Sequence, residues 1–98
     1  MLADMNTDSE ASRMLTWKSA SEADAGVKNT ESAAHAKRFA SDAAMKISTD
    51  AVQVYGGYGY SEEYPVARLM RAAKVMQIYE GSSQVQRMII GREITKNL

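Results

Sequence analysis

Residues 31–60, ESAAHAKRFASDAAMKISTDAVQVYGGYGY, decide the fold because they combine a helical period with an abrupt stop. Apolar side chains recur at spacings of three and four on one face, whereas charged residues such as Lys37 and Asp42 lie off it. Alanine favours the helix and lets a neighbouring helix approach closely. Glycines at positions 56, 57 and 59 end the helix and predict a loop over residues 57–64. The predicted face comprises Ala36, Phe39, Ala40, Ala43, Ala44, Ile47, Ala51, Val52 and Tyr55.

Before this stretch, residues 2–24 carry apolar side chains at helical spacing and predict a second long helix. Ala25-Gly26 provides its C-terminal cap, and Asn29-Thr30-Glu31 reads as the cap and first turn of the helix over residues 31–55. Because only a few residues separate the two helices, we expect them to be antiparallel. Trp17 is predicted to be a core or interface anchor.

After the glycines, Pro65 is suited to a first helical position and predicts a short helix to about residue 75. A break at Gly81 precedes a final helix to about residue 96, with Ser83 and Gln86 at capping-box spacing. Its predicted apolar face comprises Val85, Met88, Ile89 and Ile94. The sequence thus predicts one all-α domain over residues 1–98: a small helical bundle of two long antiparallel helices, a short helix and a C-terminal helix.

The composition excludes several functional classes. The 98 residues carry 12 basic and 12 acidic side chains, so there is no net charge to attract nucleic acid. No cysteine and a single histidine, His35, leave no thiolate or imidazole-rich metal site. No apolar run is long enough for a membrane span, and the start of the chain lacks a basic-then-apolar signal pattern. We therefore expect a cytoplasmic protein that binds neither nucleic acid nor metal.

Residues 53–92, QVYGGYGYSEEYPVARLMRAAKVMQIYEGSSQVQRMIIGR, carry linked motifs that resemble the C-terminal signature of the flavin-dependent acyl-CoA dehydrogenases. The family pattern is Q-x-x-G-G-x-G-Y, then Y/M-P-x-E-R, R-D-A, I-Y-E-G-T-S and Q-R. The resemblance extends through the alanine-rich helix and covers essentially the whole chain. It implies an incomplete C-terminal four-helix bundle of an enzyme that binds FAD and forms homotetramers. Such enzymes convert an acyl-CoA to the trans-2-enoyl-CoA and are usually reoxidised by an electron-transferring flavoprotein.

The resemblance implies that Glu80 is the catalytic base of a short- or medium-chain enzyme. A carboxylate removes the proton α to a thioester carbonyl only in a dry site where its pKa rises on substrate binding. Gly81 gives a sharp turn and room for the acyl chain, so it is the predicted substrate-binding residue. Backbone N–H groups at this turn would bond the thioester oxygen as enolate charge develops. The purely structural alternative is a solvated glutamate at a helix end.

Two further segments are implied to contact FAD. The first segment commonly belongs to a neighbouring subunit and contacts the adenosine diphosphate portion of FAD. Its backbone N–H groups are accessible because its glycines carry no side chain. The other lies where a helix N-terminus and two hydroxyl groups suit an anion or a ribose. The alternative is that the glycines only stop one helix and the serines only cap another. The segments are Gln53, Val54, Tyr55, Gly56 and Gly57, and Ser82, Ser83 and Gln84.

Departures from the family pattern bear on activity. Ala67 and Ala72 stand where the family has Glu and Asp. The neighbouring Arg68 and Arg71 therefore lack those carboxylates. We expect the two arginines to be exposed or differently packed, because a buried arginine without its partner is costly. The resemblance also implies N-terminal and β domains and a further bundle helix outside these residues. We therefore expect the isolated chain to lack turnover and to form a homo-oligomer through its uncovered apolar face. The alternative function is an enzyme-derived helical module for self-association or partner binding, with Glu80 idle.

Overall fold

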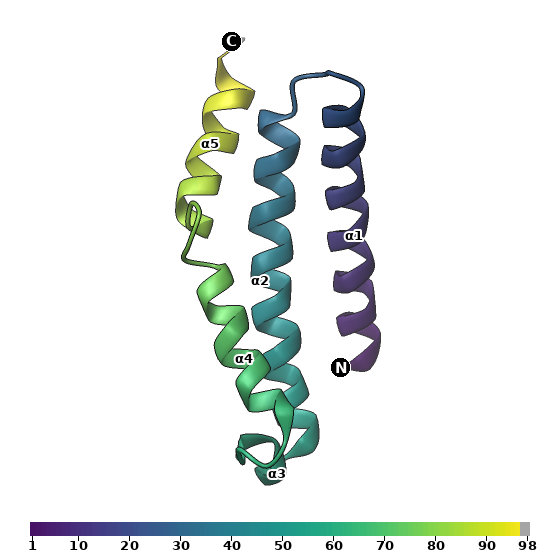
Figure 1. Ribbon diagram of the computed structural model, residues 1–98, viewed down its shortest axis with the longest axis vertical. Helices are drawn as coiled ribbons and strands as arrows, with labels where there is room; N and C mark the ends of the chain where they lie inside the picture. The colour runs from purple at the N-terminus through teal and green to yellow at the C-terminus, as the bar shows by residue number, and fades with distance from the viewer. Residues whose placement is uncertain (97–98) are drawn as a thin grey trace.

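The computed structural model describes residues 1–96 and contains five helices, with no strand in that range (Figure 1). The all-α prediction is therefore confirmed, and the two long helices are antiparallel. The ends of the predicted long and C-terminal helices agree with the structure to within a residue or two. The helices are α1 (Leu2–Asp24), α2 (Thr30–Tyr55), α3 (Gly57–Tyr60), α4 (Pro65–Met76) and α5 (Ser83–Thr95).

The helices are arranged around α2, which contacts each of the other four. Figure 1 shows α1 on one side of α2, with α4 and α5 following each other along the other side. Within residues 1–96, α1 packs against neither α4 nor α5. The described chain is therefore an open row of helices rather than a closed bundle.

The contacts of α2 are made by small side chains. Ala34, Ala36 and Ala43 are buried, but Phe39 and Ile47 are only partly covered and Tyr55 is exposed. The predicted apolar face is thus only partly the buried one. Among the described residues no large side chain is completely buried, so close helix approach rather than bulky packing makes this core.

The connection between α1 and α2 lies where the sequence predicts it, but Asn29 acts differently from the prediction. Gly26 adopts a positive φ of 73° just after α1. Asn29 occupies the N-cap position of α2, yet its side chain forms no capping hydrogen bond. Instead its Nδ2 donates to the backbone oxygen of Ser19 at 3.1 Å and to the Ser19 hydroxyl at 3.2 Å. Asn29 therefore ties the turn to α1.

The predicted loop over residues 57–64 is wrong at its start, where Gly57–Tyr60 forms the short helix α3. Gly59 is buried against the end of α2. A Cβ atom at this position would lie 2.5 Å from the Val52 backbone oxygen and 2.7 Å from the Tyr55 Cβ. Glycine permits this return of the chain onto α2, and the three glycines do more than stop a helix.

The start and the buried face of α5 also differ from the prediction. The N-cap is Ser82 rather than Ser83, and its hydroxyl accepts a hydrogen bond from the Val85 N–H at 3.3 Å. The face against α2 buries the polar residues Ser83 and Gln86. By contrast, the predicted apolar residues Val85, Met88 and Ile94 are 43%, 73% and 57% exposed. The apolar period of α5 therefore points away from the described core.

Trp17 is not a core residue of the described chain. It is 58% exposed, and the Arg13 guanidinium lies 6.0 Å from its ring centroid. The alternative role of Trp17 as an interface anchor stays a prediction.

Two glycines allow a matched test of the packing. Gly59→Ala should destabilise the chain by about 1–3 kcal/mol, because the backbone of α2 must move away from the new Cβ. Gly91→Ala should stabilise it by about 0.5–1 kcal/mol, because Gly91 lies inside α5 with nothing within 4 Å of its Cβ position. Thermal unfolding followed by circular dichroism measures both shifts. Equal shifts of the same sign would contradict the close approach at Gly59.

Candidate functional site

The turn between α4 and α5, residues 77–82, carries the predicted catalytic carboxylate. Glu80 is exposed and has a φ of 55°, the only positive value of a non-glycine residue among residues 1–96. An L-residue adopts this left-handed conformation at a cost, and such strain is concentrated at functional sites. The Glu80 side chain is therefore exposed, and the backbone of Glu80 has a conformation that is unfavourable for a residue with a Cβ atom.

Gly81 follows with a φ of 91° and lies against the first turn of α5. A Cβ atom here would lie 2.5 Å from the Gln86 Nε2. That amide instead donates to the Gly81 backbone oxygen at 3.3 Å. The positive φ favours glycine at this position, and a side chain here would also displace the Gln86 amide from the Gly81 oxygen.

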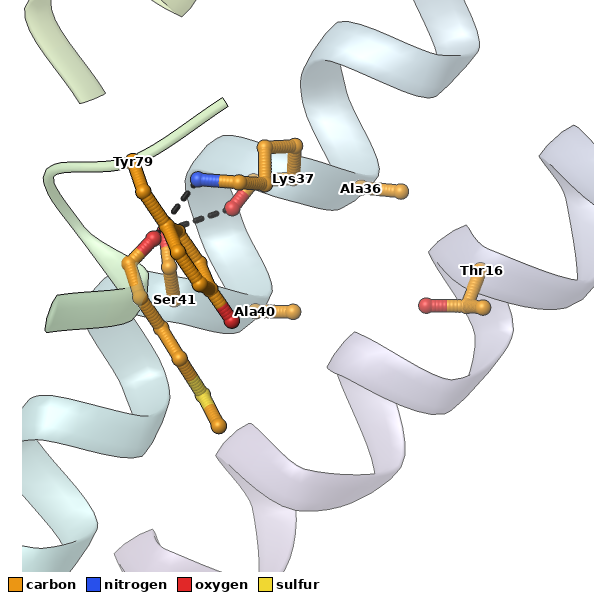
Figure 2. A pocket seen from close by; sticks show the side chains of 7 residues that line it. Thr16, Ala36, Lys37, Ala40, Ser41 and Tyr79 are labelled. Carbon is orange, nitrogen blue, oxygen red and sulfur yellow. Dashed lines mark hydrogen bonds between the residues drawn. The ribbon is translucent and has the colours of Figure 1, made fainter. Parts of the chain in front are cut away.

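Lys37 of α2 holds this turn from one side (Figure 2). Its Nζ donates to the Met76 backbone oxygen at 2.6 Å and to the Gly81 backbone oxygen at 3.3 Å. The same amino group lies 5.8 Å from the ring centroid of Tyr79, within the range of a cation–π interaction. These groups line one wall of a pocket of about 360 Å³ that extends to Thr16 of α1.

Asp42 of α2 holds the turn from a second point. Its Oδ1 accepts hydrogen bonds from the Gln77 Nε2 at 2.8 Å and from the Ser83 hydroxyl at 2.7 Å. Its Oδ2 accepts from the Arg87 Nη2 at 3.1 Å. Burial raises the pKa of Asp42, but the hydrogen bonds from Ser83 and Gln77 and two nearby arginines outweigh it. The pKa of this carboxyl is therefore held below its usual value.

The three residues predicted to contact FAD at the start of α5 have different surroundings. Ser82 caps the helix, and Gln84 is exposed. Ser83 is only 4% exposed, its hydroxyl donates to Asp42, and its backbone N–H donates to the Gln77 oxygen at 3.0 Å. Both donors of Ser83 are therefore engaged inside the chain. Ser82 and Gln84 remain accessible to a ligand.

The second predicted FAD segment, Gln53–Gly57, is exposed along its whole length. Gly56 has a φ of 66°, and nothing lies within 4 Å of a Cβ at Gly56 or Gly57, so the backbone there is open to a ligand. Tyr55 packs edge-on against Tyr64, with 5.8 Å between ring centroids. The segment thus has the access that a pyrophosphate contact requires.

The structure does not bring the two FAD segments into one pocket. They lie at opposite ends of α4, which has 12 residues and is therefore about 18 Å long (Figure 1). If both segments contact the same part of one flavin, they must therefore belong to different copies of the chain.

The two arginines beside the family departures are exposed, as expected. Ala67 is buried against the rest of the chain and Ala72 is exposed. Arg71 forms only a surface ion pair with Glu62, with 3.7 Å between Nη1 and Oε1. Neither Arg68 nor Arg71 is therefore a buried charge that lacks a partner.

Residues 1–96 contain no cluster of three or more histidine, cysteine, aspartate or glutamate side chains able to hold a metal ion. No helix among them is long and apolar enough to cross a membrane.

Sequence reasoning did not identify Lys37 and Asp42 as part of the site. It placed them only off the apolar face of α2, and their partners lie 35–44 residues away along the chain. Their one local signal is that both are charged within an alanine-rich helix.

The fold and the turn together define a class: a helical domain with an exposed carboxylate on a strained turn between two helices. The sequence pattern of the acyl-CoA dehydrogenase C-terminal domain matches residues 1–95. The chain belongs to the acyl-CoA dehydrogenase family, of which it represents the C-terminal helical domain.

Individual relatives support this assignment. The chain is 53% identical over 96 residues to cyclohexane-1-carbonyl-CoA dehydrogenase of Geobacter metallireducens, covering 98% of the chain and 25% of that protein. Butyryl-CoA dehydrogenase from Megasphaera elsdenii has a TM-score of 0.95 at 55% identity, over 97% of the chain and 25% of the relative. A structure described for the electron transferring flavoprotein of Acidaminococcus fermentans and flavin-based electron bifurcation contains a chain with a TM-score of 0.96 at 50% identity. That match covers 98% of this chain and 25% of the other.

The chain spans about a quarter of the length of the curated relatives it matches.

The strain at Glu80 has a measurable consequence. Glu80→Gly should stabilise the chain by about 1 kcal/mol relative to Glu80→Ala, because glycine adopts the positive φ without a Cβ penalty. Glu63→Gly is the matched control, since Glu63 is an exposed glutamate of the preceding loop with a negative φ. That control should lower the melting temperature measured by circular dichroism. A Glu80→Gly chain that melts no higher than Glu80→Ala would rule out strain at this residue.

Proposed function

We propose that this chain supplies the C-terminal helical domain of a FAD-dependent acyl-CoA dehydrogenase that acts on a short or medium acyl-CoA. Membership of the family supports the reaction class, and the relative named butyryl-CoA dehydrogenase supports a short acyl chain. The observation that carries the proposal is Glu80, an exposed carboxylate on a strained turn within the IYEG motif. The isolated chain is proposed to lack turnover, because the family resemblance implies that further domains, outside these residues, complete the site around the flavin ring and the substrate.

Glu80 is proposed to be the base. Its carboxylate takes the proton from the α carbon of the acyl thioester, and the electron pair of that C–H bond forms the new α,β double bond. The backbone N–H of Glu80 donates to no group within residues 1–96, so it is free to bond the thioester oxygen as negative charge develops there. Gly81 keeps the next position of the turn free of a side chain. Bound FAD supplies the acceptor for the hydride that leaves the β carbon.

The flavin contacts are assigned to the two accessible segments. Ser82 and Gln84 would bind from the start of α5, where helix N–H groups and a hydroxyl favour anionic or ribose oxygens. Gln53–Gly57 would hold the adenosine diphosphate portion through its open glycine backbone. Because the two segments are separated by the length of α4, we propose that each FAD contacts one segment from one copy of the chain and the other segment from a second copy. Ser83 is given a structural role, because both of its donors are engaged inside the chain.

The proposed partners are an acyl-CoA substrate and an electron-transferring flavoprotein. The similarity to a chain in the Acidaminococcus fermentans structure supports the second partner, since that structure is described for such a flavoprotein.

A second candidate role, self-association, is favoured by the open row of helices. The groove between α2 and α4 has a volume of about 340 Å³ and an almost wholly apolar lining that includes Ile47, Leu69 and Met76. Leu69 is 53% exposed there. The chain has no net charge, so a second copy meets no overall repulsion. We propose that a second copy of the chain covers this groove.

Light scattering tests this proposal on the 98-residue chain. At high micromolar concentration we expect the mass of a dimer, and Leu69→Glu should shift it to a monomer because a carboxylate in a covered apolar groove is costly. Val27→Glu is the control, because Val27 is similarly exposed at 54% but lies in the turn between α1 and α2. A monomeric wild-type chain that binds no hydrophobic dye would contradict the proposal.

The catalytic proposal is tested in a complete enzyme, with residues 1–98 grafted onto the Megasphaera elsdenii butyryl-CoA dehydrogenase in place of the segment they match. The graft should bind FAD and oxidise butyryl-CoA. Glu80→Gln should lower kcat per bound flavin by about 10³-fold or more, because the amide cannot accept the α proton. FAD content and melting temperature should stay at the level of the unsubstituted graft.

Glu63→Gln is the matched control, because it makes the same chemical change at an exposed glutamate outside the turn. It should leave kcat unchanged. Retained activity in Glu80→Gln would overturn the assignment of the base, and a folded graft without FAD would overturn the assignment of the flavin segments. Strong unfolding by Glu80→Gln would show that Glu80 is structural.

A further inference from the structure

The turn that carries Glu80 has little packing of its own. Ile78, Tyr79 and Glu80 are all exposed, and Ile78 is 60% exposed despite being apolar. A backbone hydrogen bond from Ser83 to Gln77 closes the turn at 3.0 Å, but it does not fix the turn relative to the other helices. Something other than apolar burial must hold the strained Glu80 in place.

Two side chains of α2 provide this link, and each of them bridges the two ends of the turn. Lys37 donates from a single Nζ to the oxygen of Met76, just before the turn, and to the oxygen of Gly81, near its end. Asp42 accepts on a single Oδ1 from Gln77, the first residue of the turn, and from Ser83, just after it. The two bridges are of opposite polarity and come from the same helix.

The chemistry of both bridges resists opening. An ionised donor or acceptor makes shorter and stronger hydrogen bonds than a neutral one, and distances of 2.6–2.8 Å from Lys37 to Met76 and at the Asp42 Oδ1 are of that kind. Arg87 contacts the second oxygen of Asp42 at 3.1 Å and keeps the carboxylate oriented. Met76 ends α4, where the last backbone oxygens have no helical N–H partner, so Lys37 satisfies an acceptor that the helix leaves open. The Gly81 oxygen accepts from both Lys37 and Gln86.

We propose that Lys37 and Asp42 are positioning residues for Glu80: together they fix both ends of its turn to α2 and so set where the carboxylate meets the substrate. This inference rests on the proposed function of Glu80. A base displaced by about 1 Å loses on the order of 100-fold in rate, so the loss of either bridge should lower kcat.

The test uses the grafted dehydrogenase, with rates expressed per bound flavin. Lys37→Met removes the donor at nearly constant length, and Asp42→Ala removes both acceptors. Each should lower kcat by about 10- to 100-fold while KM for butyryl-CoA changes by less than about 3-fold. Lys46→Met and Asp50→Ala are the matched controls, because both residues lie on α2 and neither bonds to the turn. The controls should retain the unsubstituted kcat.

Conservative variants separate positioning from simple support of the fold. Asp42→Asn keeps an oxygen that accepts from Gln77 and Ser83, and Lys37→Arg keeps a charged donor near the two carbonyls. Both should recover most of the lost kcat. If kcat per bound flavin in Lys37→Met and Asp42→Ala equals that of the controls, or if only melting temperature and FAD content fall, the positioning role is wrong.

The two proposals fail in different ways. Retained activity in Glu80→Gln removes the base itself and with it this inference. Loss of activity in Glu80→Gln together with full activity in Lys37→Met and Asp42→Ala keeps the base and overturns the positioning role alone. Amide hydrogen exchange over residues 77–82 in the same variants checks the turn directly, and it should accelerate in Lys37→Met and Asp42→Ala but not in the controls.

Discussion

The close packing of α2 is the constraint on which the rest of the structure depends, because every other helix contacts it. Its buried positions are alanine and serine, including Ala34, Ala36, Ser41 and Ala43. Small side chains bring helix backbones close together, but they bury little apolar area. Val66 is buried, but several larger apolar side chains of α4 and α5, such as Leu69 and Met88, consequently remain exposed. An arrangement of this kind is suited to a domain whose outer faces are covered by other parts of an assembly.

The apolar core is small, and hydrogen bonds between buried polar groups add specific contacts to it. The buried serines bond within the chain: Ser41 donates to the Lys37 oxygen at 2.6 Å, and Ser83 donates to Asp42. Gln86 is buried beside Gly81 and donates to its oxygen. A buried polar group must find a partner of suitable geometry, so these bonds specify one arrangement where alanine contacts alone would allow sliding. Two of the buried polar residues, Ser83 and Gln86, bond to the turn that carries Glu80.

Local patterns predicted the four longer helices, but neither α3 nor the contacts around the turn before α5. The period of residues 2–24, the glycines after Tyr55 and Pro65 are all signals read within a few residues, and the corresponding helix ends agree with the structure. The buried face of α5 could not be read in this way, because Ser83 and Gln86 are buried by partners on α2 and in the turn. The family signature identified Glu80. No pattern in the neighbouring sequence indicates its positive φ or the bridges from Lys37 and Asp42.

The two bridges from α2 oppose relaxation of the strained conformation of Glu80. A glutamate at a φ of 55° would relax if its turn were free, since the left-handed conformation is unfavourable for an L-residue. Apolar burial does not prevent this, because Ile78, Tyr79 and Glu80 are all exposed. Hydrogen bonds to the backbone and side chains at the ends of the turn hold it without covering its centre. The helix that organises the core is therefore also the element that fixes the turn of Glu80 while its carboxylate stays exposed.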